Sequence, residues 1–315
     1  MRSMSKINVI DEIKYVTSQY RNAANLNTRI GLHQRFSVNP YGWMPWVFDQ
    51  LDFPSQGRIL ELGCGTGQLW LDNIDRIPAG WEITLTDFSA GMLQQAQENL
   101  SPRRSFRFQA VDAQSIPFES GSFDGVLANH MLYHVPDKTK ALGEIQRVLK
   151  PQGRFYASTV GQSHLQEIGS MVSRFDPRLD WWGAQPGDTF ALENGAALLA
   201  GWFTEVALRR YEDALIVTEP GPLIEYILSG RVTLDAGQQV EFARFVQQEF
   251  ERLGGRFPIT KDSGIFISRR HSSTENNYHR VHRDHKENQR KTTEPLRHGD
   301  PSYIPPSPPT KLESD

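Results

Sequence analysis

Three glycines at alternate positions, directly after a short apolar run, have the spacing needed to hold a ligand. They lie in Glu61-Leu-Gly-Cys-Gly-Thr-Gly67, which follows Arg58-Ile-Leu60. The apolar run predicts a buried parallel strand, and glycines permit the sharp turn and close backbone approach that a ligand at the end of a strand requires. Gln68 stands where the dinucleotide fingerprint G-x-G-x-x-G has its third glycine. The acidic Glu61 also suits an amine-bearing ligand better than a pyrophosphate.

Acidic residues follow the next two predicted strands. The segment 81–87 reads as a strand that ends in Asp87, and 105–111 reads as a strand followed by Asp112. In an open α/β sheet, an acid at the end of the second strand accepts hydrogen bonds from ribose hydroxyls. Ser89 is well placed to cap the helix that begins after Asp87. Asp87 is therefore a candidate partner for a ribose, although an acid at this position can also simply interact with the helix dipole.

Taken together, these motifs resemble those of the class I S-adenosylmethionine (SAM) dependent methyltransferases, in the small-molecule (type 11/25-like) group. Glu61–Gly67 looks like motif I, Asp87–Leu93 resembles the family's D-x-S-x-x-M-L segment, and Asp112–Phe118 is similar to D-A-x-x-L-P-F. Arg147–Gly153 is close to R-V-L-K-P-G-G, although Gln152 replaces one glycine. The resemblance is specific over residues 55–160 and extends loosely to 270.

The resemblance implies a cofactor, SAM, with S-adenosylhomocysteine as its product. It also implies methyl transfer by a single in-line displacement to an oxygen, nitrogen or carbon of a small-molecule acceptor. The expected cofactor-binding residues are Glu61, Gly63, Cys64, Gly65, Gly67, Asp87, Phe88, Met92, Asp112, Ala113 and Asn129.

The acceptor side rests on polar and aromatic residues at two places in the chain. His130, Tyr133 and His134 follow the fourth predicted strand and are the candidate catalytic residues, because a neutral histidine can take a proton from a hydroxyl or amine. A packing role for them stays open. The expected substrate-binding residues, in an N-terminal segment that would close over the ligand, are Tyr20, Arg29, His33 and Trp43.

Alternative functions remain at this point. They are methyl transfer to a macromolecule such as tRNA or protein, a non-catalytic SAM-binding protein, and a nicotinamide oxidoreductase, which Gln68 and Glu61 disfavour. The fourth strand is followed by Asn129-His-Met-Leu132 instead of D-P-P-Y or N-P-P-Y, which argues against DNA methyltransferases that act on exocyclic amines.

Composition narrows the class of protein further. The chain has 315 residues, of which 38% are hydrophobic and 23% charged, and its net charge is -3. This balance gives no electrostatic case for nucleic-acid binding. One cysteine excludes an intrachain disulfide, and no apolar run approaches the length of a membrane span. We expect a cytoplasmic monomer or homodimer without a metal site.

The remaining pattern predicts one doubly wound α/β domain, because strands alternate with helices as far as residue 268. We expect a seven-stranded, mostly parallel Rossmann-like sheet over residues 51–270, with an N-terminal helical cap over 1–50. The strands after the fifth are expected near 205–211 and 264–268, with helices near 221–229 and 236–253 between them. Residues 271–315 are polar and proline-rich, so we expect a disordered tail.

Overall fold

The computed structural model describes residues 24–179, 181 and 190–271. Residues 272–315 of the expected tail, the first part of the expected cap and Tyr20 lie outside these ranges. His271, which was expected to begin the tail, is buried, so the folded part extends one residue beyond the predicted boundary. The described residues belong to one compact unit that ends at His271.

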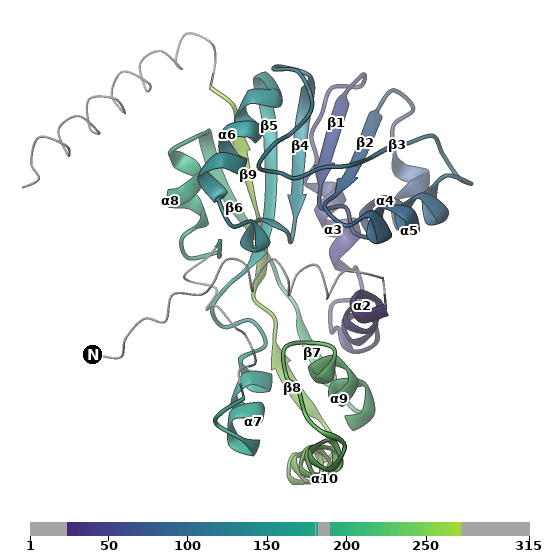
Figure 1. Ribbon diagram of the computed structural model, residues 1–315, viewed down its shortest axis with the longest axis vertical. Coiled ribbons are helices and arrows are strands. Elements are labelled where there is room, and N and C mark those ends of the chain that lie inside the picture. The colour runs from purple at the N-terminus through teal and green to yellow at the C-terminus, as the bar shows by residue number, and fades with distance from the viewer. Residues whose placement is uncertain (1–23, 180, 182–189, 272–315) are drawn as a thin grey trace, which may run out of the picture. The chain divides into compact units, whose positions relative to one another are not determined.

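A seven-stranded sheet forms the centre of this unit (Figure 1). Its strands are β1 (Arg58–Leu62), β2 (Glu82–Asp87), β3 (Arg107–Ala110), β4 (Phe123–Asn129), β5 (Leu149–Val160), β6 (Thr204–Tyr211) and β9 (Ser263–Arg269). Their order is β3-β2-β1-β4-β5-β9-β6. The first five pair in parallel, and β9 runs antiparallel to both β5 and β6. The predicted seven-stranded, mostly parallel sheet is therefore confirmed.

Helices cover both faces of this sheet, and the alternation of side chains along each strand explains why. On β1, Leu60 and Leu62 join the core on one face, whereas Ile59 joins the core on the other. Both faces are apolar because a parallel sheet is buried on both sides. The covering segments are α3 (Trp43–Asp49), α4 (Gln68–Leu71), η1 (Ile74–Arg76) and α5 (Ala90–Leu100) on one face, and η2 (Leu132–His134), α6 (Lys138–Val148) and α8 (Gly195–Ala200) on the other.

Ser89 confirms the predicted helix start, since its side chain accepts a hydrogen bond from Met92 N at the beginning of α5.

A second, smaller lobe lies beyond the carboxyl ends of the parallel strands. It contains the two-stranded sheet of β7 (Ala214–Val217) and β8 (Phe257–Thr260) with the helices α2 (Ala24–Phe36), α7 (Gln166–Phe175), α9 (Pro220–Leu228) and α10 (Ala236–Arg252). β6 leads into β7 and β8 leads into β9 across two residues each, so the β6–β9 pair carries the small sheet out of the main one. The helices 220–228 and 236–252 thus cover β7 and β8 instead of the main sheet. No strands are predicted from the sequence at the positions of β7 and β8.

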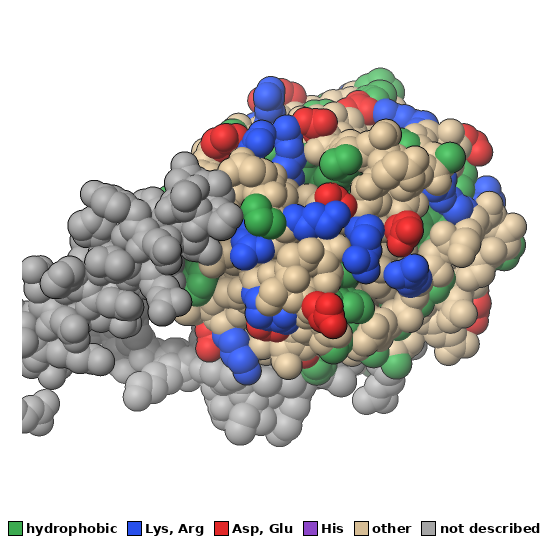
Figure 2. Space-filling view, turned by 90° about the horizontal axis from the view of Figure 1, so that it is seen from above, with side chains coloured by type: hydrophobic (Ala, Val, Ile, Leu, Met, Phe, Trp, Pro, Cys, Tyr) green, Lys and Arg blue, Asp and Glu red, His purple; other side chains and the backbone are tan. Residues whose placement is uncertain are grey.

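The opposite edge of the main sheet, at the amino ends of the parallel strands, carries charges of both signs. Figure 2 looks onto this edge and shows Lys and Arg side chains interleaved with Asp and Glu. Ion pairs join Lys150 to Asp124 and Arg269 to Glu205 there. Charges of both signs are therefore mixed on this face.

None of the helices within the described ranges is long and apolar enough to cross a membrane.

Candidate functional site

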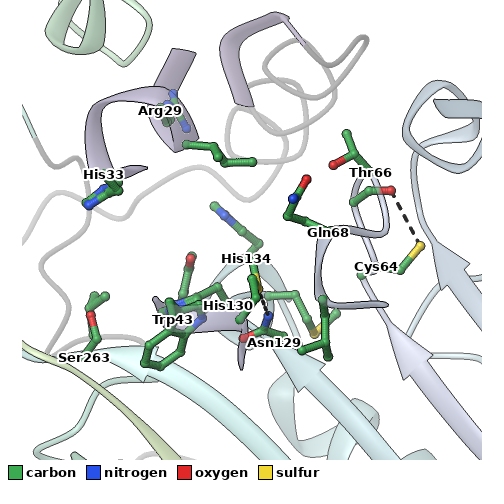
Figure 3. A pocket seen from close by; sticks show the side chains of 18 of the residues that line it. Arg29, His33, Trp43, Cys64, Thr66, Gln68, Asn129, His130, His134 and Ser263 are labelled. Atoms are coloured by element: carbon green, nitrogen blue, oxygen red, sulfur yellow. Dashed lines mark hydrogen bonds between the residues drawn. The ribbon is translucent and has the colours of Figure 1, made fainter. Parts of the chain in front are cut away.

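A cavity of about 870 Å³ lies at the carboxyl ends of β1, β2 and β4, where the main sheet meets the small lobe. Its walls come from both parts of the molecule. In the view of Figure 3, His130 and His134 lie between the turn residues Cys64 and Thr66 on one side and His33 of α2 on the other. Ligands of doubly wound proteins bind at this edge of the sheet. Its volume is in the upper part of the range of ~300–1,000 Å³ typical of small-molecule sites.

The turn after β1 depends on its glycines. Gly63, Gly65 and Gly67 all have positive φ angles, of 68°, 56° and 77°. A Cβ atom at Gly63 would also lie 2.8 Å from the Cβ atom of Met131, which is closer than real side chains approach. The turn therefore needs glycine at position 63 both for its backbone conformation and for its packing.

Glu61 is the acid of this turn, and its side chain is buried. Trp70 on α4 donates its indole N–H to the Glu61 carboxyl at 2.6 Å. Burial raises the pKa of Glu61 to about 7; the Trp70 hydrogen bond opposes this shift and the nearby Asp87 adds to it. A buried carboxyl of this kind would pair with an amine-bearing ligand, because a cation offsets the cost of ionising it.

Asp87 ends β2 and faces the same turn. Its carboxylate accepts hydrogen bonds from Gly65 N at 2.9 Å and from Ser89 N at 2.8 Å. Burial nevertheless raises the pKa of Asp87. Phe88 beside it leaves 59% of its surface exposed, so its ring offers a flat apolar face at the mouth of the cavity.

The turn after β4 holds His130 in an unusual conformation. His130 has a φ of 52°, which is uncommon for a residue with a side chain, and its N–H donates to Ser158 Oγ at 2.9 Å. Ser158 in turn donates to the side chain of Asn129. The His130 ring lies 4.9 Å from that of Trp43, between centroids. Burial, and then the charge of Lys261, lower the pKa of His130 to about 4, so the ring is neutral at pH 7.

The small lobe adds more imidazoles to the far end of the cavity. His33 of α2 stacks on His164 with 6.3 Å between the ring centroids. Burial lowers the pKa of His33 to about 3, and lowers that of His164 well below its ordinary value. The pKa of His134 also falls to about 3, first by burial and then by the charges of Arg29 and Arg231. These rings are hydrogen-bonding groups instead of cations at neutral pH.

Nearly all of the predicted site residues line this one cavity. They are Glu61, Gly63, Cys64, Gly65, Asp87, Phe88, Met92, Asp112, Ala113 and Asn129 at and after the ends of the first four strands, His130, Tyr133 and His134 in the turn that follows β4, and Arg29, His33 and Trp43 from the N-terminal segment. Gly67 shapes the turn without lining the cavity. Their individual roles remain predictions.

Several lining residues were not predicted as site residues from the sequence. They include Thr66, Gln68, His164, Tyr226, Arg231, Lys261 and Ser263. Most of them come from the small lobe, whose residues are distant in the chain from any motif. The only available signal was the polar pair Lys261-Asp262 between two apolar runs.

Cys64 is buried, and burial raises the pKa of its thiol well above the ordinary value. Cys64 therefore behaves as a small buried side chain. Across the described ranges, no group of His, Cys, Asp and Glu has the arrangement of a metal site.

Comparison with known proteins agrees with this geometry. Residues 60–157 match the family model described as "Methyltransferase domain". A demethylmenaquinone methyltransferase from Desulfitobacterium hafniense is 32% identical over 146 residues, which cover 45% of this chain and 57% of that protein. A ubiquinone/menaquinone biosynthesis C-methyltransferase from Geotalea uraniireducens is 34% identical over 115 residues, which cover 36% and 49%. The chain thus spans about half the length of the curated relatives that it matches.

Among solved structures, phosphoethanolamine N-methyltransferase 2 from Haemonchus contortus, in complex with S-adenosyl-L-methionine, has a similar fold. Its TM-score is 0.51 at 15% identity, and the match covers 86% of this chain and 62% of that one. Residues 60–157 of this chain are thus similar to a methyltransferase domain, and the fold is similar to that of a SAM-dependent methyltransferase.

Proposed function

We propose that the protein is a SAM-dependent methyltransferase that moves a methyl group to an oxygen, nitrogen or carbon nucleophile of a small molecule. One observation carries this proposal. A single cavity joins the glycine turn and acids of the main sheet to a chamber of neutral histidines and aromatic rings, which come from both the main sheet and the small lobe. Such a cavity has room for a donor and an acceptor side by side.

The residues at the cofactor end fit SAM. Glu61 is a buried acid for its ammonium group, and Asp87 stands at the strand end where ribose hydroxyls are bound. Asp112 and Ala113 line the part of the wall where the family resemblance places the adenine, with the apolar Met92 and Phe88 nearby. SAM supplies an activated methyl group on a sulfonium.

The chain itself positions the acceptor and excludes water from the reacting atoms. Holding the acceptor nucleophile in line with the methyl group can provide most of the acceleration. The turn at Asn129 and His130 is fixed by Ser158, so this part of the wall is preorganised. The aromatic rings of Trp43 and Tyr226 exclude water from the far side.

The relatives support a small acceptor, since the curated ones carry names of quinone-biosynthesis C-methyltransferases. Methyl-labelled SAM, incubated with cell extract separated by size, tests this. Label in the small-molecule fraction is expected. Label found only in RNA or protein would support the macromolecular alternative, and no transfer despite SAM binding would indicate a binding protein.

Calorimetry with S-adenosylhomocysteine tests the assignment of the cofactor end. Asp87→Ala and Asp112→Ala should each weaken binding by roughly 1.5–3 kcal/mol, the value of hydrogen bonds to a charged group. Glu241→Ala, an exposed acid on α10, is the matched control and should bind like the wild type. Unchanged affinity in both Asp variants would reject this location for the cofactor.

A further inference from the structure

Lys261 places an ammonium group in the wall of the part of the cavity that the histidines and aromatic rings line, which we call the acceptor end. It lies in the two-residue connection between β8 and β9, and its side chain is only 8% exposed. Its Nζ atom forms an ion pair with Asp213 at 2.5 Å, and Asp213 lies in the matching connection between β6 and β7. Lys261 lines the cavity, whereas Asp213 lies behind it.

Asp213 is well satisfied by other donors. Its carboxylate accepts hydrogen bonds from Ser37 Oγ at 2.6 Å, from Asn39 N at 3.0 Å and from Ala214 N at 2.8 Å. An ammonium group has three N–H donors. Among the described residues, the one hydrogen bond of the Lys261 ammonium goes to Asp213. The ammonium also lies over the Tyr211 ring, with Nζ 5.7 Å from the ring centroid. Because Lys261 lines the cavity, a ligand there can use the donors that Asp213 leaves over.

Apart from the Asp213 carboxylate, three neutral imidazoles from separate elements lie near Lys261. His33 belongs to α2, His130 follows β4, and His164 precedes α7. The charge of Lys261 contributes to the low pKa of all three rings, after burial as the largest cause for each. Lys261 is thus close to all three, and none of them competes with it for an anion at pH 7.

His33 adds an unused hydrogen-bonding atom to the same wall. Its Nδ1 is buried and has no partner among the residues that the structure describes. A buried polar atom without a partner costs free energy, and a ligand atom that bonds to it can remove that cost. A cation with spare donors beside an unpartnered imidazole nitrogen is a suitable site for an anionic oxygen.

We propose that Lys261 is the counter-ion of the methyl acceptor, which binds through an anionic oxygen against the Lys261 ammonium and the His33 ring. The acceptor is therefore a phenol or enol bound as its oxyanion, or a carboxylate. This inference rests on the proposed function, since it names the acceptor class of the same cavity. Asp213 positions Lys261 without entering the cavity.

A purely structural ion pair makes a different prediction. If Lys261 only links the two connections to the small lobe, then Lys261→Met and Asp213→Asn should behave alike, because each breaks the pair. If Lys261 binds the acceptor, the two variants should differ. Lys261→Met removes the cation. Asp213→Asn keeps the cation and frees the Lys261 N–H group that bonds to Asp213, so that this group can also bond to the ligand.

The probe is 4-nitrophenol, whose phenolate is yellow while the phenol is not. The full chain, saturated with S-adenosylhomocysteine, is titrated with the probe over a range of pH. We expect the pKa of the bound probe to fall by about one unit, which is tenfold tighter binding of phenolate than of phenol. The shift should persist in Lys261→Arg and Asp213→Asn and disappear in Lys261→Met. Benzoate and benzamide form the second arm, which distinguishes a carboxylate from a phenolate.

An unshifted bound probe, together with benzoate no tighter than benzamide, overturns the proposal. So does failure of both anions to bind at millimolar concentration, or a loss of the preference that is equal in Lys261→Met and Asp213→Asn. Affinity for S-adenosylhomocysteine is measured first, and the anion titrations are repeated without it. Failure to bind S-adenosylhomocysteine would reject the proposed function. The titrations without it would still show whether the cavity prefers an anion at Lys261.

Discussion

The indole N–H of Trp70 donates a hydrogen bond to the carboxyl of Glu61 over 2.6 Å, and both side chains are buried. This bond holds α4, the first helix after β1, against the carboxyl end of β1. It also stabilises the ionised form of Glu61 against burial, which raises its pKa to about 7. The ligand-free carboxyl is therefore partly protonated at neutral pH, and a cationic ligand would ionise it.

Glu61→Gln should make the ligand-free protein more stable at high pH. The unfolded chain releases the Glu61 proton near pH 4.5 and the folded protein only near pH 7, so stability from this group is lost as pH rises through 7. Glutamine keeps the shape and can still accept from Trp70. Urea unfolding at pH 8 should show a gain of about 3 kcal/mol, at 1.36 kcal/mol per pKa unit, and at pH 4.5 little difference. The same variant should bind SAM more weakly. Equal stability of variant and wild type at pH 8 would show that Glu61 is not a strained acid.

Gly63→Ala and Gly121→Ala form a matched pair. Both glycines have a φ of 68°, so each alanine incurs left-handed strain of about 1–2 kcal/mol. A Cβ atom at Gly121 meets nothing within 4 Å, whereas one at Gly63 meets Met131 at 2.8 Å. We expect the shared strain to lower the melting temperature of both variants by a similar amount. The contact with Met131 should lower that of Gly63→Ala further, and only Gly63→Ala should lose SAM affinity. Equal affinities in the two variants would contradict a ligand role for the turn.

The buried histidines should make the protein acid-sensitive. His33 and His134 take protons near pH 3 in the folded state, whereas the unfolded chain takes them near 6.5. The contribution of these histidines to the free energy of unfolding is therefore fully present above pH 6.5, and it declines as the pH falls toward 3. Urea unfolding between pH 7.5 and 5 should show this decline, and it should be shallower in His134→Gln. An identical slope in the variant would mean that His134 is already protonated or exposed.

The cofactor end was predictable because its residues are close together in the chain. Motif I supplies the turn and its acid within seven residues, and Asp87 and Asp112 follow the next two strands directly. Parallel strands bring such positions to one edge of the sheet whatever the details of packing. Strand alternation and glycine spacing therefore carried enough information to place them.

The acceptor end was less predictable because it is built by long-range contacts. Lys261 meets Asp213 across 48 positions, and His33 meets His164 across an even longer separation. β7 and β8 are four residues each, too short to show a clear alternation. The helices 220–228 and 236–252 were expected correctly, but their partner, the small sheet, can be identified only from the fold.

Trp43 and Trp46 offer the last test, since they lie three positions apart on α3 with different surroundings. Trp43 lines the cavity, and its indole Nε1 is buried without a partner among the described residues, whereas Trp46 does not line the cavity. Trp43→Phe removes a donor that has nothing to bond in the ligand-free protein, so stability should stay level or rise. Acceptor KM should increase while affinity for S-adenosylhomocysteine stays unchanged, because the ring is at the acceptor end.

Trp46→Phe is the control, and it should leave acceptor KM near that of the wild type. The two rings contact each other with 5.2 Å between centroids, so general loosening of α3 would affect both variants alike. Label transfer from SAM, measured over a range of acceptor concentrations in the active small-molecule fraction, separates the cases. A rise in KM in Trp43→Phe alone means that the Trp43 side chain contacts the acceptor. Equal KM values would instead assign Trp43 to packing, and its buried N–H would then be a cost that the ligand does not relieve.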